Sequence, residues 1–206
     1  MNVQVLKQNQ IVKDRESKPH LLLIGAAHTG LEDAETKELG RTHYEIMAII
    51  FSALALEAFT NTFCKKFSVN WSGKRNRKQR NQNRKQKCSK LLVKLKVICE
   101  RLKIEADFEN QEPWSFVQWL IDFRDDVAHA NLQPIEFREV IAAEDCDFWR
   151  VHNPPLSEIE KRINLENARR SVKIVDEIFD IIYQKLTLKE RASVFFDGHS
   201  GVVSSC

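Results

Sequence analysis

A short charged run, Arg124-Asp125-Asp126-Val127-Ala128-His129, carries residue types that could act on a phosphate ester. A histidine titrates near neutral pH and can serve as a general acid or base. An arginine stays protonated, and its planar fork of N–H donors suits phosphate oxygens. On a helix, residues five apart are rotated by roughly 140°. Arg124 and His129 are therefore not expected to share one face of a single helix.

Two aspartates accompany this pair. Asp125 and His129 lie four residues apart and would share a helix face. Asp125 could then accept a hydrogen bond from the imidazole, which would fix its tautomer and raise its basicity. We assign Asp126 a supporting role beside them.

A carboxylate elsewhere in the chain is the expected partner of Arg124. Glu57 is the only charged residue in the apolar run 46–59. A charge within such a helix requires a partner, because burying an unpaired charge is very costly. We therefore predict that the helices carrying Glu57 and Arg124 pack together and that these two residues lie close. Asn61, four residues after Glu57, would share its face and support the site.

Four stretches have the apolar spacing of amphipathic helices. They begin at Thr42, at Lys90 (to about Lys103), at Glu112-Pro113 (to His129) and at about Asn164 (to Lys185). The fold class predicted is all-α, an up-and-down bundle of four to five helices with a short extended excursion around 133–155. In the first helix the predicted buried stripe comprises Tyr44, Met47, Ile50, Phe51, Leu54, Ala58 and Thr62, broadened by Ile49, Ala53, Leu56 and Phe63.

The predicted domain organisation has three parts. Residues 1–41 form an N-terminal extension in which only 21–27 could be a short buried element, 42–187 form the bundle, and 188–206 form a loose tail. The chain of 206 residues is long enough for one stable core. Its five cysteines are odd in number and scattered, with no C-x-x-C pair, which argues against a disulfide framework and against a zinc site. We expect no metal site. We expect no cofactor.

Charge is strongly segregated along the chain. Thirteen lysines and arginines and no acidic residue lie between positions 58 and 99, which leaves 19 basic and 29 acidic residues elsewhere. A basic stretch on an otherwise acidic protein favours an anionic partner. The basic insert 71–90 is predicted to be a loop that contacts RNA phosphates. Stacking of unpaired bases on Trp71 is expected to add to the binding. Its predicted RNA-binding residues are Lys74, Arg75, Arg77, Lys78, Arg80, Arg84, Lys85 and Lys87.

An Arg-x4-His sequence with a polar residue after the arginine, together with an acidic first helix reading Ala-Leu-Glu-Ala-Phe, resembles the HEPN superfamily. Arg124, Asp125 and His129 match that motif, and Glu57 matches its less strict acidic position. The resemblance covers about residues 42–185. It implies a helical bundle that cleaves RNA without metal at a homodimer interface, leaving 2′,3′-cyclic phosphate ends. Such proteins act in toxin–antitoxin and phage-defence systems, so an antitoxin or defence-system partner is implied.

Two alternatives stay open at this point. The chain could be a non-catalytic helical module that presents its Lys/Arg loop to nucleic acid or to an acidic protein. It could also be a partner subunit in a toxin–antitoxin or defence pair. We expect a cytoplasmic location and no membrane association, because the longest apolar stretch spans about 14 residues, which is short for a bilayer.

Overall fold

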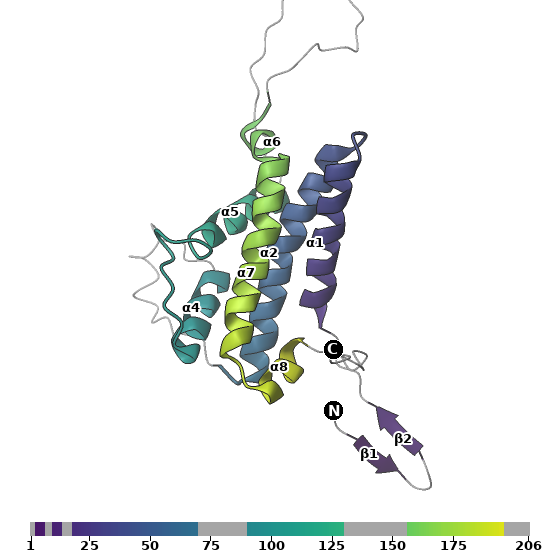
Figure 1. Ribbon diagram of the computed structural model, residues 1–206, viewed down its shortest axis with the longest axis vertical. Coiled ribbons are helices and arrows are strands. Elements are labelled where there is room, and N and C mark those ends of the chain that lie inside the picture. Colours follow the sequence, from purple (N-terminus) through teal and green to yellow (C-terminus); the bar gives the residue numbers. More distant parts are fainter. Residues whose placement is uncertain (1–2, 7–9, 14–17, 70–89, 130–155, 196–206) are drawn as a thin grey trace, which may run out of the picture.

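The computed structural model describes residues 3–6, 10–13, 18–69, 90–129 and 156–195. Seven helices lie in these ranges, preceded by a two-stranded antiparallel hairpin, so the all-α class is confirmed and the small hairpin is an addition to it (Figure 1). The elements are β1 (Val3–Leu6), β2 (Gln10–Lys13), α1 (Pro19–Thr36), α2 (Arg41–Lys66), α4 (Lys90–Leu102), α5 (Phe116–His129), α6 (Glu158–Arg162), α7 (Leu165–Lys185) and α8 (Leu188–Phe195).

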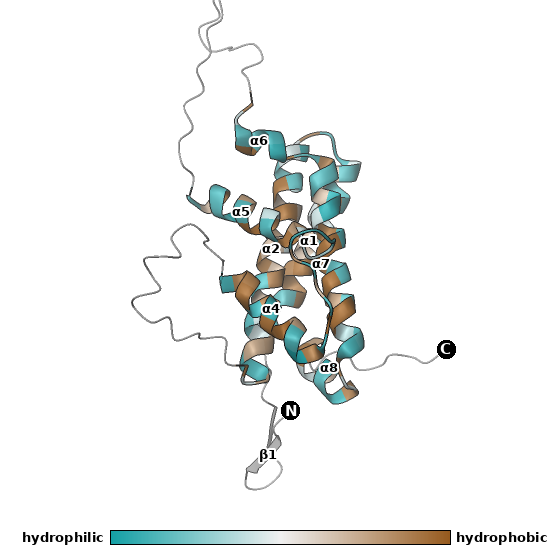
Figure 2. Cartoon of the chain, turned by 90° about the vertical axis from the view of Figure 1, so that its left-hand side faces the viewer, coloured by the Kyte–Doolittle hydropathy of each residue, from teal (hydrophilic) through white to brown (hydrophobic). Residues whose placement is uncertain are grey.

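Helix α2 is the central element of the bundle. Helices α1, α4, α5, α7 and α8 all contact it, and Figure 1 shows it running behind α7 with α1 along one side. Figure 2 shows hydrophobic and hydrophilic residues mixed along α4 and α7, as expected for helices that each bury one face. The largest fully buried side chains come from four of these helices: Ile49, Leu56, Phe59, Phe63, Leu95, Ile98, Leu120, Ile121, Phe123, Ile174, Ile178 and Ile182.

Local sequence sets the helix ends. Gly40 adopts a positive φ of 77° immediately before α2. Ser68 and Lys103 adopt positive φ angles just after α2 and α4, and the following amides of Val69 and Ile104 bond back to the carbonyls of Cys64 and Cys99, each at 2.9 Å. These hydrogen bonds satisfy carbonyls that a helix end leaves free.

At the start of α7, the Asn164 side chain accepts a hydrogen bond from the Asn167 amide at 2.9 Å. This N-cap explains why the observed start lies within a residue of the predicted one. Helix α5 differs more, because it begins at Phe116 and not at Glu112-Pro113. The residues before it form turns, in which Asp107 accepts a hydrogen bond from the Glu109 amide at 2.9 Å.

Residues 19–36 form a full helix of the bundle, which corrects the prediction of an N-terminal extension reaching residue 41. Helix α1 runs antiparallel to α2, since His20 packs against Phe59 while Gly30 lies against Met47 and Ala48. A Cβ added at Gly30 would lie 3.0 Å from the Ala48 nitrogen and 3.1 Å from the Met47 Cβ. Glycine therefore permits a close approach of the two helices. Helix α1 was not predicted from the sequence because its apolar residues lie all around its circumference and leave no clear polar face.

The predicted loose tail from residue 188 is also corrected. Helix α8 returns to the bundle, where Val194 is fully buried and Phe195 packs against Phe59 and Phe179. The Lys18 ammonium donates a hydrogen bond to the Ser193 carbonyl, which joins the start of α1 to α8. The bundle therefore extends at least from residue 18 to residue 195, and the remainder of the predicted tail lies outside the described residues.

The buried face of α2 is rotated relative to the prediction. Residues of the predicted stripe, such as Met47 and Leu54, are only partly buried. The broadening residues Ile49, Ala53, Leu56 and Phe63 are buried, and the rest of the buried face comprises Glu45, Ala48, Ser52, Ala55, Phe59, Thr60 and Cys64. Apolar side chains occupy almost the whole circumference of this helix, so its spacing alone did not fix which face is innermost. Helices α4, α5 and α7 each bury one apolar face, as their amphipathic spacing predicts.

A strict up-and-down order does not hold for α2 and α4. Lys94 contacts Asn61 and Arg101 contacts Phe67, so the contacts advance in step along both helices and the two run parallel. The connection of residues 67–89 is long enough to return along the bundle, which is why consecutive helices need not be antiparallel. The predicted extended excursion around 133–155 lies outside the described residues.

Helix α2 is long and apolar enough, by length and composition alone, to cross a membrane. That result differs from the expectation based on the shorter run 46–59. Half of the apolar window is buried inside the bundle, and the core helix of a bundle passes the same test.

Two glycines of α1 give a matched test of the α1–α2 contact. A Cβ at Gly25 would meet nothing within 4 Å, whereas one at Gly30 would meet α2 backbone. We expect Gly25→Ala to stabilise the fold by about 0.5–1 kcal/mol, because alanine is the better helix former. Gly30→Ala should destabilise it by about 1 kcal/mol or more through overpacking. Urea unfolding measures both, and equal stabilisation by the two changes would contradict the close contact.

His20 gives the stability of the bundle a pH dependence. Its ring is fully buried and packs edge-on against Phe59, Phe179 and Phe195. Burial, assisted by the nearby Lys18 charge, lowers the His20 pKa from 6.5 to about 4. The unfolded chain binds this proton more tightly than the folded chain does, so stability is full above the unfolded pKa and declines as pH falls toward 4.

We expect the free energy of unfolding to fall by about 2 kcal/mol between pH 7.5 and pH 5 through this histidine alone. Urea titrations of wild type and His20→Leu at both pH values measure its share, because the variant should lose that part of the pH dependence. His43→Ala, at an exposed position of α2, is the control. An unchanged pH dependence in His20→Leu would show that the histidine does not titrate as described.

Candidate functional site

Helix α5 positions Arg124 at the edge of the core. The helix buries Phe116, Val117, Leu120, Ile121 and Phe123 against the bundle. Arg124 follows Phe123 directly, so its guanidinium emerges where α5 meets α2, and its side chain is 19% exposed. An arginine at such a boundary can form ion pairs that are partly shielded from water.

Two carboxylates hold the Arg124 guanidinium. Its NH1 group donates to Glu57 of α2, which confirms the prediction that these two residues lie close and that their helices pack together. Its Nε and NH2 groups donate to one oxygen of Asp125, at 3.1 and 2.7 Å. The guanidinium is therefore fixed by partners on two helices. A planar fork with both edges engaged is held in one orientation.

Asp125 does not orient His129 as expected. Its carboxylate turns to Arg124, and within the described part of the chain no hydrogen bond joins it to His129. His129 is exposed at the last turn of α5. The Asp125 carboxylate pairs with Arg124 because a charge-assisted hydrogen bond to a permanent cation is stronger than a hydrogen bond to a neutral imidazole. As expected for residues five apart, Arg124 and His129 do not meet within this chain.

Asp126 has a partner that the sequence did not reveal. Its carboxylate accepts a hydrogen bond from Arg162 of α6, whose guanidinium carbon lies 5.2 Å from the centre of the Phe123 ring. The buried Nε of Arg162 has no hydrogen-bond partner among the described residues. Arg162 belongs to a five-residue helix with no apolar stripe, so no pattern in the sequence singled it out.

Aromatic rings form a stacked column along α5. Trp119 lies between Phe116 and Phe123, with ring centroids 4.8 and 5.4 Å apart and nearly parallel planes. Arg170 covers the outer face of Phe116 at 4.3 Å. Both faces of the Trp119 ring are thus occupied by neighbours, so Trp119 acts as a packing residue of α5. The column stiffens the helix that carries Arg124.

Asn61, predicted to support the site, lies on the same edge of α2 as Glu57. Its side-chain oxygen accepts a hydrogen bond from the Lys94 ammonium of α4. Asn61 therefore connects α2 to α4, whereas Glu57 connects α2 to α5. The predicted RNA-binding residues of the insert, Lys74 to Lys87, lie outside the described residues.

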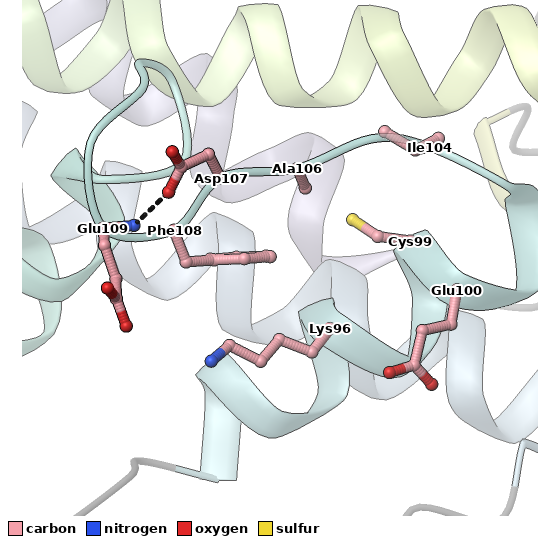
Figure 3. Close-up of a pocket in the computed structure, with 8 residues that line it drawn as sticks. All are labelled: Lys96, Cys99, Glu100, Ile104, Ala106, Asp107, Phe108 and Glu109. Carbon is pink, nitrogen blue, oxygen red and sulfur yellow. Dashed lines mark hydrogen bonds between the residues drawn. The ribbon is translucent and has the colours of Figure 1, made fainter.

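A shallow pocket of about 480 Å³ lies between α4 and the segment that follows it (Figure 3). None of the predicted site residues lines it. Cys99 forms part of its wall, and burial raises the pKa of that thiol to about 12, so it is not a reactive thiolate. The described residues contain no group of three or more His, Cys, Asp or Glu side chains placed to hold a metal ion.

Comparisons with known proteins leave the chain without an assigned relative. No protein-family model, no curated protein and no solved structure matches it significantly. The site must therefore be interpreted from its own geometry.

The ion pair between α2 and α5 can be measured directly. We expect Glu57→Gln and Arg124→Gln, combined in a double-mutant cycle, to show a coupling of about 1 kcal/mol in unfolding free energy, since Arg124 is partly shielded while Glu57 is about 39% exposed. The matched control is Glu35→Gln with Arg169→Gln, an exposed pair between α1 and α7, for which less than about 0.5 kcal/mol is expected. Equal coupling in both cycles would contradict a special role for the shielded pair.

Proposed function

We propose that the protein is a metal-independent endoribonuclease of the HEPN type, which binds single-stranded RNA and cuts it at a site formed by two copies of the chain. Arg124 and His129 would act on the phosphodiester, with Glu57 and Asp125 positioning Arg124. The observation that carries this proposal is the arginine held by Glu57 and Asp125 on the same helix as an exposed histidine five residues later.

Cleavage of RNA requires few catalytic groups from the protein. The 2′-hydroxyl is the nucleophile, so the protein has to supply only a proton acceptor, a proton donor and stabilisation of the charge that develops on phosphorus. His129 would move a proton, a contribution typically worth ~10²–10⁴-fold in rate. Arg124 would stabilise the phosphorane oxygens through its donors. The products would be a 2′,3′-cyclic phosphate and a 5′-hydroxyl.

A single copy of the site is incomplete for this reaction. Arg124 and His129 face different directions on α5, and both edges of the guanidinium are engaged by carboxylates. Glu57, Asp125 and Asp126 outnumber the two arginines, Arg124 and Arg162, by one charge. A second chain could bring its own histidine and arginine to the same phosphate. The half-exposed Asp125 could then rotate away and let a phosphate oxygen take its place on Arg124.

The same geometry also suits a second function. A guanidinium saturated by two carboxylates is an ordinary way to join two helices, and His129 has no partner in the described part of the chain. A non-catalytic module would use the bundle as a scaffold and bind nucleic acid through its basic surface alone. The two functions differ in one respect, namely whether His129 matters for RNA cleavage.

The context proposed for either function is cytoplasmic, in a toxin–antitoxin or phage-defence system. An antitoxin or defence-system partner would control the exposed site. The segregation of thirteen lysines and arginines between positions 58 and 99, a stretch with no acidic residue, supports an anionic ligand such as RNA.

Cleavage can be tested with purified protein and single-stranded RNA in excess chelator. We expect fragments that end in a 2′,3′-cyclic phosphate, and no cutting of a substrate whose 2′-hydroxyls are absent. His129→Ala should slow cleavage by about 10²–10⁴-fold and leave RNA affinity unchanged. Fragment analysis by mass spectrometry and binding by fluorescence anisotropy give the two readouts.

His43→Ala is the control, since it also removes an exposed histidine, in the first turn of α2 and about 21 Å along that helix from Glu57. Wild-type protein that binds RNA tightly without cutting it would reject the nuclease in favour of the binding module. Cleavage that survives in His129→Ala would reject the assigned role of the histidine.

A further inference from the structure

Positive charge in the described structure gathers where the C-terminal half of α2 meets α4. Lys90, Lys94 and Arg101 lie at four- and seven-residue spacing and so share one face of α4. Asn61 and Lys65, four residues apart, share one edge of α2. We name these five residues the α2–α4 seam: Asn61, Lys65, Lys90, Lys94 and Arg101.

Contacts place the two sides of the seam together. The Lys94 ammonium donates to the Asn61 side chain. Arg101 donates to the Phe67 carbonyl at 3.2 Å, and its guanidinium carbon lies 5.1 Å from the centre of the Phe67 ring. The side chains of Lys94 and Arg101 therefore both lie against α2. Lys65 and Lys90 are exposed, whereas Lys94 is only 7% exposed. A shielded charge such as Lys94 is screened less by salt than its exposed neighbours are.

The seam leads to Arg124. Glu57, Asn61 and Lys65 follow one another at four-residue steps along one edge of α2, over about 12 Å. The first is bound by Arg124 and the second by Lys94. Because α2 and α4 run parallel, Lys90 lies near the level of Glu57, at the Arg124 end of the seam. A line of basic residues on α4 therefore extends from the candidate site to the C-terminal end of α2.

We propose that the α2–α4 seam binds the phosphate backbone of a single RNA strand and delivers that strand to Arg124. This rests on the proposed function and deepens it, because it names the surface that holds the substrate outside the reacting phosphate. A length of about 12 Å covers roughly three or four nucleotides at 3.4 Å per nucleotide along one strand. The Asn61 side chain, on the path between the two ends, offers an amide to base edges.

Phosphate contacts have a defined signature in solution. Each neutralised phosphate releases counterions, so the logarithm of the binding constant falls with the logarithm of salt concentration by about 0.7 per contact on single strands. Loss of two contacts should therefore reduce that slope by about 1.4. Substitutions in the seam should weaken binding and flatten its salt dependence, and should leave the chemical step intact.

The test compares Lys65→Glu/Lys90→Glu with Lys173→Glu/Lys189→Glu, which changes net charge equally on exposed positions of α7 and α8. The probe is a fluorescein-labelled single-stranded 2′-O-methyl RNA, which lacks the nucleophile and is not cut. Between 50 and 200 mM salt, we expect the seam variant to bind at least tenfold more weakly at low salt, with the shallower slope. The α7–α8 variant should stay within about twofold of wild type. Circular dichroism confirms that both variants fold.

Cleavage of unmodified RNA by the same proteins separates the two proposals. The seam variant should raise KM and keep kcat near the wild-type value, whereas His129→Ala lowers kcat. Equal binding by the seam and α7–α8 variants would overturn the seam and leave the nuclease standing. Seam-dependent binding without any cleavage would overturn the nuclease and leave the seam standing. Competition by polyglutamate as effective as that by RNA would overturn the nucleic-acid assignment, in favour of non-specific polyanion binding to this surface or to the insert.

Discussion

The burial of α2 is the constraint on which the rest of the molecule depends. Almost every turn of this helix carries large apolar side chains, and their removal from water is the main favourable term in folding. Five other helices lie against it because no single partner could cover so much apolar surface. The one carboxylate within that apolar run, Glu57, must then meet a cation at the boundary of the core. Arg124 is that cation, so the same constraint that builds the core also fixes the residue at the centre of the candidate site.

Charge segregation gives the molecule two electrostatically different regions. Around Arg124 the carboxylates are in slight excess, and this restrains the guanidinium. Along α4 and the end of α2, basic residues dominate and Glu100 lies on a different side of α4 from Lys94 and Arg101. A polyanion would be attracted to the second region by its net charge and would reach the first only by competing with carboxylates. Attraction and positioning are thus assigned to separate groups of residues.

Much of the architecture could be predicted from the sequence, for identifiable physical reasons. Helices with one apolar face, such as α4 and α7, were predicted close to their observed bounds because three- and four-residue spacing is a strong signal. The Glu57–Arg124 pair was predicted because a lone charge in an apolar run demands a partner. Helix α1 and the true buried face of α2 were not predicted, since apolar residues surround both helices. Arg162 and the Lys94–Asn61 contact depend on tertiary packing between segments, which periodicity does not encode.

The parallel course of α2 and α4 has a consequence for chain length. The chain leaves α2 at Phe67 and re-enters a helix at Lys90, near the level of Glu57, so the two points differ by only about 15 Å along the bundle. Residues 68–89 could extend over roughly 70 Å. Only a few extended residues are needed to span about 15 Å, so the segment is much longer than the connection between the two helices requires. The length of this connection is therefore not set by the need to join α2 to α4, and a much shorter segment would permit the same parallel arrangement of the two helices.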